Sequence, residues 1–178
     1  MSKKTLVVVA HPNMAQSRIN RTWAEHLRQH ADRITVHDLY AAYPDGKIDV
    51  PAEQALLEAH DRIILQFPLF WFSTPAFLKS WIDQVLAYGW AFGPGGDKLE
   101  GKSIGIAVST GGPAFAYQAG AQNQFTLSEL LRPLQMTVQY VRGQYLPAFA
   151  LQGALYGITD EELESNAQAY VKHVLGEA

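Results

Sequence analysis

The chain alternates short apolar runs with segments in which apolar residues recur at helical spacing. Residues 6–10 form an uninterrupted apolar run, which is typical of a parallel strand buried on both faces. The same reasoning predicts strands at four more places along the chain. These are residues 33–39, 62–67, 103–109 and a fifth strand within 137–145.

Between these runs, the spacing of apolar residues predicts helices. Ser17 is a suitable N-cap for a helix that presents Ile19, Trp23 and Leu27 on one side. The other helices are expected over residues 52–60 after Pro51, directly after Pro75, over residues 125–131 with an end near Pro133, and from a capping box at 159–162. Residues 40–51 and 89–101 are rich in turn-forming residues and are predicted as loops.

Strands and helices alternate over the whole chain, without a repeat, a low-complexity linker or a change in composition. Such alternation predicts an α/β fold in which helices cover both faces of one parallel sheet. For five strands, the most common arrangement is the flavodoxin-like order 2-1-3-4-5. We therefore expect residues 1–178 to form a single domain with its ligands at the carboxyl ends of the strands.

Composition and charge narrow the classes of function. Hydrophobic residues make up 48% of the 178 positions and charged residues 17%, which is enough apolar surface for a core. The net charge of −3, without a basic block, argues against nucleic acid as a partner. The absence of cysteine excludes disulfides, a thiol nucleophile and cysteine-ligated metals. Because no apolar run resembles a signal peptide or a membrane span, we expect a cytoplasmic protein.

The loop after the first predicted strand has features of an anion site. It leads into a helix N-terminus, whose free N–H groups and dipole favour a phosphate. Ser17 and Asn20 offer hydrogen-bond donors, His11 or Arg18 offers a positive charge, and Ile19 lies between them in this segment. The alternatives are that Ser17 is an ordinary helix cap and that His11 is structural.

The loop after the third predicted strand carries three consecutive aromatic residues. Phe70, Trp71 and Phe72 follow Pro68 and Leu69. Three adjacent aromatic side chains on a loop cannot all face a core, so the cluster indicates a ligand platform or an interface. Packing against the next helix is the alternative.

Tryptophan is concentrated within residues 71–90. Aromatic residues make up 11% of the sequence, and three of the four tryptophans are Trp71, Trp81 and Trp90. Trp81 falls on the apolar face of the helix after Pro75, and Trp90 lies at the edge of a glycine-rich loop. We expect these two to be packing or dimer contacts, and we assign only residues 70–72 to a ligand site.

The loop after the fourth predicted strand contains Ser109, Thr110, Gly111 and Gly112. Paired glycines allow a backbone to approach a flat ligand closely, although Gly-Gly-Pro is also an ordinary turn. All three loops leave the same edge of the predicted sheet. Phosphate donors, an aromatic wall and a glycine wall together fit a planar phosphorylated heterocycle, of which FMN is the simplest.

These segments resemble the flavodoxin-like NAD(P)H quinone oxidoreductases. The resemblance covers nearly the whole chain, and residues 68–83 are its most specific part. The other segments that carry it are 10–12 with Ser17 and Asn20, 66–67, 89–93 and 109–112. Residues 40–49 and 131–135 are most similar to the ancillary quinone reductases of glutathione-gated potassium efflux systems.

The resemblance implies a flavin held by the three loops and a homodimer with active sites at the subunit boundary. It places Tyr117 near the flavin as the catalytic residue. FMN is favoured over FAD because little chain follows the last helix to hold an adenine half. The sequence departs from many relatives at Phe70, where glutamine is common, and residues 113–117 lack a histidine found in some relatives. A histidine-assisted proton relay is therefore not expected.

The leading hypothesis is an FMN-dependent NAD(P)H:quinone oxidoreductase with a ping-pong cycle. NADH or NADPH would deliver a hydride to the flavin, and a quinone would then take its place and receive two electrons. Backbone amides near Gly111 and Gly112 would stabilise the negative charge on the reduced flavin. Tyr117 would donate a hydrogen bond or relay a proton to the quinol oxygen. The alternatives are a regulatory subunit of a potassium efflux transporter, peripheral to the inner membrane face through that partner, a flavodoxin-type electron carrier, and a non-enzymatic interaction module.

Overall fold

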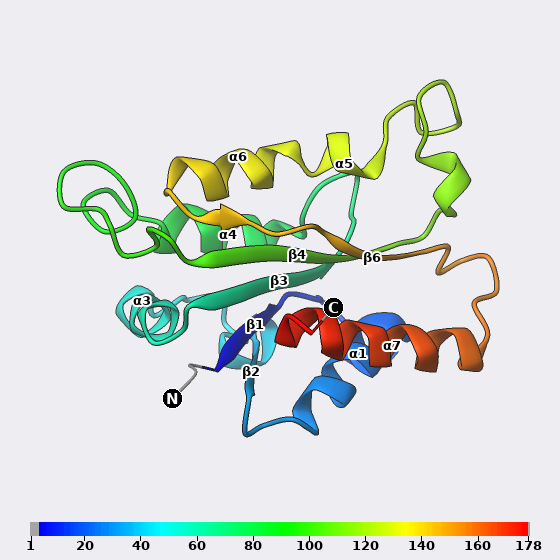
Figure 1. Ribbon diagram of the computed structural model, residues 1–178, viewed down its shortest axis with the longest axis horizontal. Helices are drawn as coiled ribbons and strands as arrows, with labels where there is room; N and C mark the ends of the chain where they lie inside the picture. Colours follow the sequence, from blue (N-terminus) through cyan, green and yellow to red (C-terminus); the bar gives the residue numbers. More distant parts are fainter. Residues whose placement is uncertain (1–3, 178) are drawn as a thin grey trace.

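The computed structural model describes residues 4–177, which contain one parallel sheet (Figure 1). Its strands are β1 (Thr5–Val9), β2 (Ile34–Asp38), β3 (Arg62–Pro68), β4 (Ser103–Thr110), β5 (Gln144–Tyr145) and β6 (Phe149–Gln152). They follow the order β2-β1-β3-β4-β5, and β6 also pairs with β4. The predicted flavodoxin-like order 2-1-3-4-5 is confirmed, with a sixth strand added.

The fifth position of the sheet is divided between two short strands. β5 pairs with Ser103 and Ile104 at the start of β4, whereas β6 pairs with its last four residues. Pro147 lies between the two strands and has no N–H group to donate to the ladder. The expectation of a fifth strand within 137–145 was therefore wrong in extent, because residues 137–140 are helical and most of the pairing comes later.

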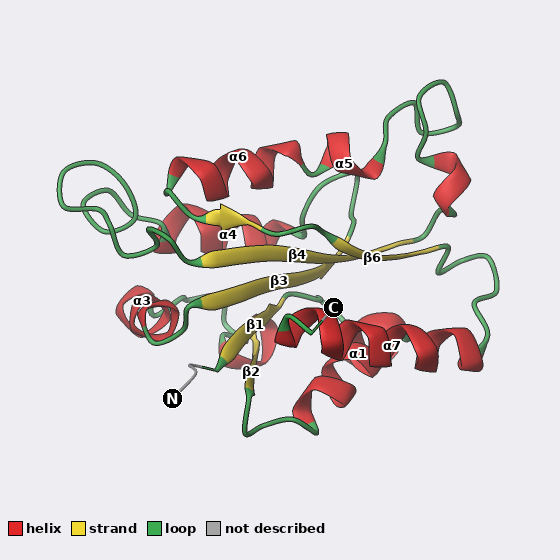
Figure 2. Cartoon of the chain, in the orientation of Figure 1, coloured by secondary structure: helices red, strands yellow, loops and turns green. Residues whose placement is uncertain are grey.

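Helices lie on both faces of the sheet (Figure 2). One face is covered by α1 (Ile19–Arg28) and α7 (Asp160–Leu175). The other face is covered by α3 (Val50–Glu58), α4 (Ala76–Val85) and α6 (Arg132–Tyr140). Among the helices of residues 4–177, none is long and apolar enough to cross a membrane.

The strands supply apolar side chains to both faces because successive residues point in opposite directions. In β1, Val7 and Val9 pack on the α1 and α7 side, whereas Leu6 and Val8 pack on the α3, α4 and α6 side. All four side chains are inaccessible to solvent. The uninterrupted apolar run of the sequence is thus the signature of a strand at the centre of a covered sheet.

Two predicted element boundaries were wrong. Pro133 does not end a helix: α5 (Leu127–Leu130) precedes it, and it lies in the first turn of α6, where its missing N–H costs no intrahelical bond. The predicted loop 40–51 begins with the one-turn helix α2 (Leu39–Ala42). The Asp38 side chain caps this turn by accepting hydrogen bonds from two backbone N–H groups. The capping box at 159–162 is confirmed at the start of α7.

A buried carboxylate joins α3 to its neighbours. Glu53 is 2% exposed, and it accepts hydrogen bonds from His37 Nε2 at 2.8 Å, the Tyr43 hydroxyl at 2.6 Å and Trp81 Nε1 at 2.8 Å. Burial raises the pKa of the Glu53 carboxyl, but the three donors outweigh burial and hold that pKa below its usual value. Trp81 is 2% exposed, so its expected packing role is confirmed.

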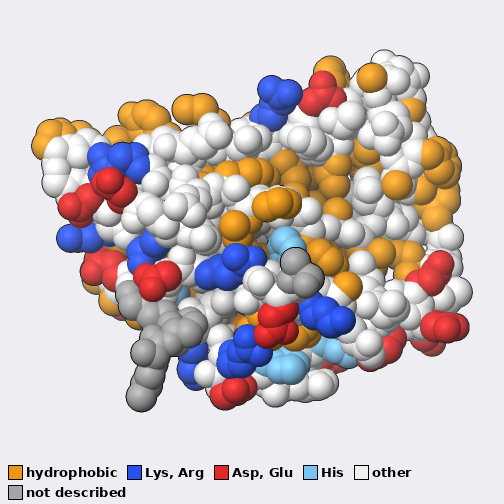
Figure 3. Space-filling model, in the orientation of Figure 1, with side chains coloured by type: hydrophobic (Ala, Val, Ile, Leu, Met, Phe, Trp, Pro, Cys, Tyr) orange, Lys and Arg blue, Asp and Glu red, His pale blue; other side chains and the backbone are white. Residues whose placement is uncertain are grey.

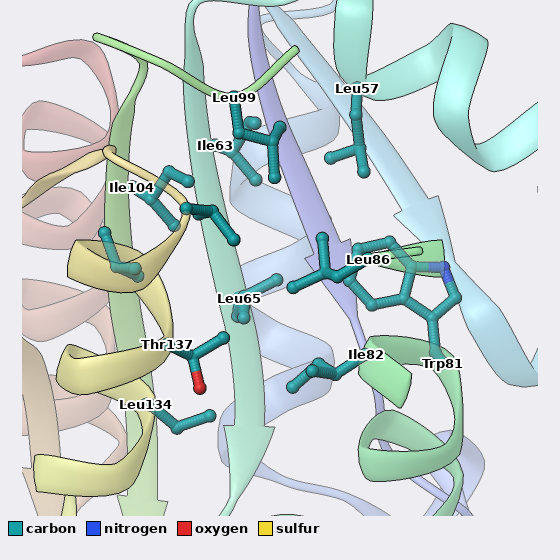
Figure 4. Close-up of a pocket in the computed structure, with 12 residues that line it drawn as sticks. Leu57, Ile63, Leu65, Trp81, Ile82, Leu86, Leu99, Ile104, Leu134 and Thr137 are labelled. Carbon is teal, nitrogen blue, oxygen red and sulfur yellow. The ribbon is translucent and has the colours of Figure 1, made fainter. Parts of the chain in front are cut away.

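A small gap remains in the core between the sheet and helices α3, α4 and α6 (Figure 4). Its volume is about 30 Å³, and its lining is apolar apart from Thr137. The gap is large enough for a methyl group or a single water, which is far below the volume of a ligand site. It is a packing defect of the core.

Candidate functional site

Four loops enclose a cavity at the carboxyl ends of β1, β3, β4 and β6. Its volume is about 410 Å³, which is in the range of small-molecule sites. The cavity lies between the ends of β1 and β3. From these two neighbouring strands the chain continues toward opposite edges of the sheet, to β2 and to β4, and ligands usually bind at such a point. Its lining residues are His11, Gln16, Ser17, Arg18, Ile19, Asn20, Pro68, Leu69, Phe70, Ser109, Thr110, Gly111, Ala154, Leu155 and Ile158.

The loop after β1 presents the N-terminus of α1 to the cavity. It includes the short 3-10 helix η1 (Met14–Gln16). The Ser17 hydroxyl accepts a hydrogen bond from Asn20 N at 3.2 Å, so Ser17 acts as a helix cap. Its O–H can still donate, because a hydroxyl has one donor and two acceptor lone pairs. The capping and ligand-binding interpretations of Ser17 are therefore compatible.

The surroundings of His11 favour a neutral imidazole, so Arg18 is the more suitable of the two candidate cations. His11 Nδ1 accepts a hydrogen bond from Asn13 N at 3.1 Å, and burial lowers the pKa of the imidazole despite the nearby Asp38 carboxylate. The ring is neutral near pH 7 as a result. It meets the Phe70 ring edge to face, with centroids 6.3 Å apart, and so orders the wall between the first and second loops.

Arg18 carries the cationic group at this edge, and it is shared with the fourth loop. Its guanidinium donates to the carbonyl of Ile158 and, at 2.6 Å, to a carboxylate oxygen of Asp160. The side chain is 46% exposed, so it is also accessible to a ligand. Arg18 thus fastens the segment before α7 to the N-terminus of α1.

The aromatic loop after β3 forms a tight turn. Backbone hydrogen bonds of 2.9 Å join Phe70 and Ser73 in both directions, and the two residues between them adopt left-handed conformations, with φ of 47° at Trp71 and 61° at Phe72. Such values are unfavourable for bulky residues and are concentrated at functional sites. Phe70, Trp71 and Phe72 are 42%, 93% and 47% exposed, so the aromatic cluster is not core.

The cavity receives only part of this cluster. Phe70 lines it together with Pro68 and Leu69, whereas Trp71 and Phe72 are not among the lining residues. They occupy the next two positions of the same turn. Their contact with a ligand remains a prediction.

The loop after β4 forms the opposite wall. Ser109, Thr110 and Gly111 line the cavity. A Cβ atom at Gly111 would come within 3.2 Å of the Leu155 side chain, so the absence of a side chain there keeps the two loops close together. The Thr110 hydroxyl donates to the Gly112 carbonyl at 2.7 Å and orders the turn.

Gly112 and Tyr117 lie behind this wall rather than on it. Neither lines the cavity, and Tyr117 is 7% exposed after the 3-10 helix η2 (Ala114–Ala116). The two are neighbours, since a Cβ atom at Gly112 would come within 3.3 Å of the Tyr117 ring. The catalytic assignment of Tyr117 therefore stays a prediction.

Sequence reasoning missed the fourth loop. Ala154, Leu155 and Ile158 line the cavity after β6, and the N–H groups of Ala154 and Leu155 donate to the carbonyls of Thr110 and Gly111. The available signal was the rule that ligand loops follow the carboxyl ends of parallel strands. Because the fifth strand was expected to end near residue 145 instead of 152, this loop was not recognised. Gln16 was missed in the first loop as well.

The donor set fits an anion beside a planar group. The first turn of α1 offers free N–H groups, and Ser17, Asn20 and Arg18 surround it. The rest of the cavity is bordered by Gly111 and by the apolar residues Leu69, Phe70 and Leu155.

The chain matches the family described as having a flavodoxin-like fold over residues 3–174. It is 48% identical to an uncharacterized NAD(P)H oxidoreductase of Bacillus subtilis, over 98% of this chain and 99% of the relative. It is 43% identical to a glutathione-regulated potassium-efflux system ancillary protein, KefG, of Salmonella newport, over 94% of this chain and 90% of the relative.

Two solved structures are similar to this chain over nearly its whole length. A general stress protein 14 from Treponema denticola, in complex with FMN, superposes with a TM-score of 0.92 at 44% identity and covers 98% of this chain and 99% of its own. An NADPH-quinone reductase from P. pentosaceus superposes with a TM-score of 0.87 at 38% identity and covers 96% of this chain and 97% of its own.

Proposed function

The chain belongs to the family of proteins with a flavodoxin-like fold, and we propose that it is an FMN-dependent NAD(P)H:quinone oxidoreductase. The observation that carries the proposal is the cavity bounded by four loops at the carboxyl ends of the strands. The similarity to an NAD(P)H oxidoreductase, an NADPH-quinone reductase and an FMN complex supports it.

FMN fits the chemistry of the lining residues. The N–H groups at the start of α1, with the hydroxyl of Ser17 and the guanidinium of Arg18, are suited to its phosphate. Gly111 lets the β4 loop approach a planar ring, and its backbone supplies polar groups at that edge. When bound, FMN supplies reversible two-electron chemistry between a nicotinamide donor and a quinone.

The aromatic turn shapes the open side of the site. Phe70 borders the cavity, and the exposed rings of Trp71 and Phe72 extend an apolar surface from it. Flat donors and acceptors stack favourably on such surfaces, and their contact excludes water from the reacting face. One open side used in turn by NADH or NADPH and by the quinone gives the ping-pong order.

Tyr117 is the proposed proton donor to the quinone oxygen. Its neighbour Gly112 directly follows the wall residues Thr110 and Gly111 in the sequence, so a small movement of this loop would bring the phenol to the site. No histidine stands in residues 113–117 to take this part.

A homodimer is part of the proposal. Hydrophobic side chains gather at the end of the molecule where η2 and the loop between β6 and α7 lie (Figure 3). Phe115, Leu155 and Tyr156 belong to these segments and are 72%, 84% and 62% exposed. Large apolar side chains exposed together beside a cavity mark an interface, and a second subunit there would enclose the open side of the site.

A second candidate function follows from the likeness to KefG. A regulatory subunit on a potassium efflux transporter would place the chain at the inner face of the membrane through its partner, and otherwise in the cytoplasm. This function is compatible with oxidoreductase activity.

Turnover tests the proposal directly. The FMN-loaded protein should oxidise NADH or NADPH at a rate that depends on added quinone. FMN binding without quinone-dependent turnover would contradict the oxidoreductase and favour the regulatory function.

A further inference from the structure

Four buried polar side chains form a continuous hydrogen-bonded path from α7 to the cavity. They are Tyr170 of α7, Gln66 of β3, Asn20 of α1 and Ser109 of β4, with exposed fractions of 0%, 0%, 1% and 5%. Gln66 stands in the middle of an otherwise apolar strand segment, where a buried amide is costly unless it is fully hydrogen-bonded. Only Asn20 and Ser109 of the four also line the cavity.

The backbone of Asn20 fixes the direction of the Gln66 amide. Gln66 Nε2 lies 3.0 Å from the Asn20 carbonyl, which can only accept, so the NH₂ group of Gln66 must face it. The Oε1 atom of Gln66 therefore faces the Tyr170 hydroxyl, 3.2 Å away, and the phenol must donate to it. Burial raises the pKa of Tyr170 well above its usual value, which keeps the phenol protonated as this bond requires.

The same constraint passes to Asn20. Gln66 Nε2 also lies 3.3 Å from Asn20 Oδ1, so Oδ1 accepts and Asn20 Nδ2 is turned toward the Ser109 hydroxyl at 2.8 Å. Ser109 Oγ is then an acceptor. Within residues 4–177, no other side-chain hydrogen bond is made by this hydroxyl, and its own O–H is left to donate from the cavity wall.

We infer that Tyr170, Gln66 and Asn20 form a one-way donor chain that makes the Ser109 hydroxyl a committed hydrogen-bond donor to an acceptor oxygen of the bound flavin. Tyr170 and Gln66 are positioning residues, since they act through Asn20 and Ser109. The identity of the bound group rests on the proposed FMN function. If these hydrogen bonds ran in the opposite direction, the Ser109 hydroxyl would present a lone pair to the ligand instead of a proton. Binding of the same flavin oxygen would then be weaker.

Tyr170→Phe is the most conservative change to this chain. It removes the first donor and keeps the ring, which packs between Trp23 and Phe149 with centroid distances of 4.7 and 5.0 Å. Tyr145→Phe is a matched control, because Tyr145 is a partly buried tyrosine of β5 that does not line the cavity. Ser109→Ala removes the last member.

The test is a double-mutant cycle on FMN affinity, measured by quenching of flavin fluorescence in apoproteins with matched melting temperatures. Tyr170→Phe leaves the direction of the Gln66 amide fixed by the Asn20 carbonyl but removes the donor to the buried Gln66 Oε1, which loosens the hydrogen-bonded path. The Kd for FMN should therefore rise roughly two- to tenfold in the wild-type background and stay unchanged in the Ser109→Ala background. Tyr145→Phe should change neither. An equal rise in both backgrounds would assign Tyr170 to packing and overturn the inference, as would no rise in either.

A second readout separates this inference from the proposed cofactor. If the wild-type protein binds no FMN, the cofactor proposal fails, and the donor chain is then judged from side-chain amide protons by NMR. Tyr170→Phe should accelerate solvent exchange of the Gln66 and Asn20 amide protons, whereas Ser109→Ala should accelerate only that of Asn20. Unchanged exchange at Gln66 in Tyr170→Phe would overturn the donor chain.

Discussion

The guanidinium of Arg18 donates to the Asp160 carboxylate at 2.6 Å and joins the start of α1 to the start of α7. Both residues are accessible, with side-chain exposed fractions of 46% and 99%, so the pair contributes little to global stability. Its importance lies in position, because the same guanidinium binds the Ile158 carbonyl at the end of the loop that borders the cavity.

Arg18→Ala should therefore weaken FMN binding without unfolding the protein. We expect the Kd for FMN to rise roughly tenfold, because the variant loses a charge near the phosphate site and loosens the fourth loop. Arg28→Ala is the matched control, since Arg28 is an exposed arginine at the far end of α1 and does not line the cavity. Equal Kd values for the two variants would contradict this role of Arg18.

Glu53 should make stability depend on acid pH. Its folded-state pKa lies below the usual value of 4.5, so the carboxylate stabilises the fold above that pH, and the stabilisation is lost as the pH falls through the lower folded value. Glu53→Gln should lower the free energy of unfolding by about 1–3 kcal/mol near pH 7, and by less as the pH falls below the folded-state pKa of Glu53.

Urea unfolding as a function of pH measures this effect. Glu58→Gln is the control, because Glu58 is also in α3 and accepts from a tryptophan, Trp90, but at the surface. A Glu53→Gln protein as stable as the Glu58→Gln protein near pH 7 would show that the buried hydrogen bonds are unimportant.

Truncation of Trp81 should lower stability, whereas truncation of Trp71 should weaken ligand binding. Trp81 is buried and donates to Glu53, so Trp81→Ala should cost about 3–5 kcal/mol of stability. Trp71 is 93% exposed, so Trp71→Ala should leave the melting temperature of the apoprotein unchanged and weaken FMN or quinone binding instead. Thermal denaturation together with quinone KM separates the two effects. A large fall in the melting temperature of the Trp71→Ala apoprotein would contradict the ligand-binding role and show that Trp71 packs against the fold.

The small core gap should accept one more carbon. Val138 is buried at its edge, and Val138→Ile adds a methylene group that the gap of about 30 Å³ can hold. Burial of one such group contributes about 0.8 kcal/mol, which corresponds to a rise of about 2 °C in melting temperature for a domain of this size. Calorimetry checks the shift, and FMN affinity should not change. A lower melting temperature would mean that the gap is closed to side chains.

The pattern of apolar runs was sufficient to predict the sheet order and three of the four loops around the cavity. Residues 6–10 and 103–109 are recognisable because central parallel strands are buried on both faces. The fifth strand was not recognisable in the same way, because Pro147 divides it and none of its residues is fully buried. The position of the fourth loop could not be predicted once the end of that strand was misplaced.

The contacts within the site were beyond sequence reasoning for a different reason. Gln66 and Tyr170 are 104 positions apart, and nothing in their local sequence indicates that they meet. The neutral state of His11 likewise depends on burial, which residue types alone do not give. The role of Ser17 as a helix cap was predictable because a cap is a contact within one turn.

In the proposed site, the cavity at the start of α1 binds FMN by its phosphate as well as its ring. Equilibrium titration of the apoprotein with FMN and with riboflavin tests it most directly, because the two ligands differ only in that phosphate. We expect saturable binding of one FMN per chain and at least roughly tenfold weaker binding of riboflavin. No binding of FMN at saturation, or equal affinity for both ligands, would contradict it.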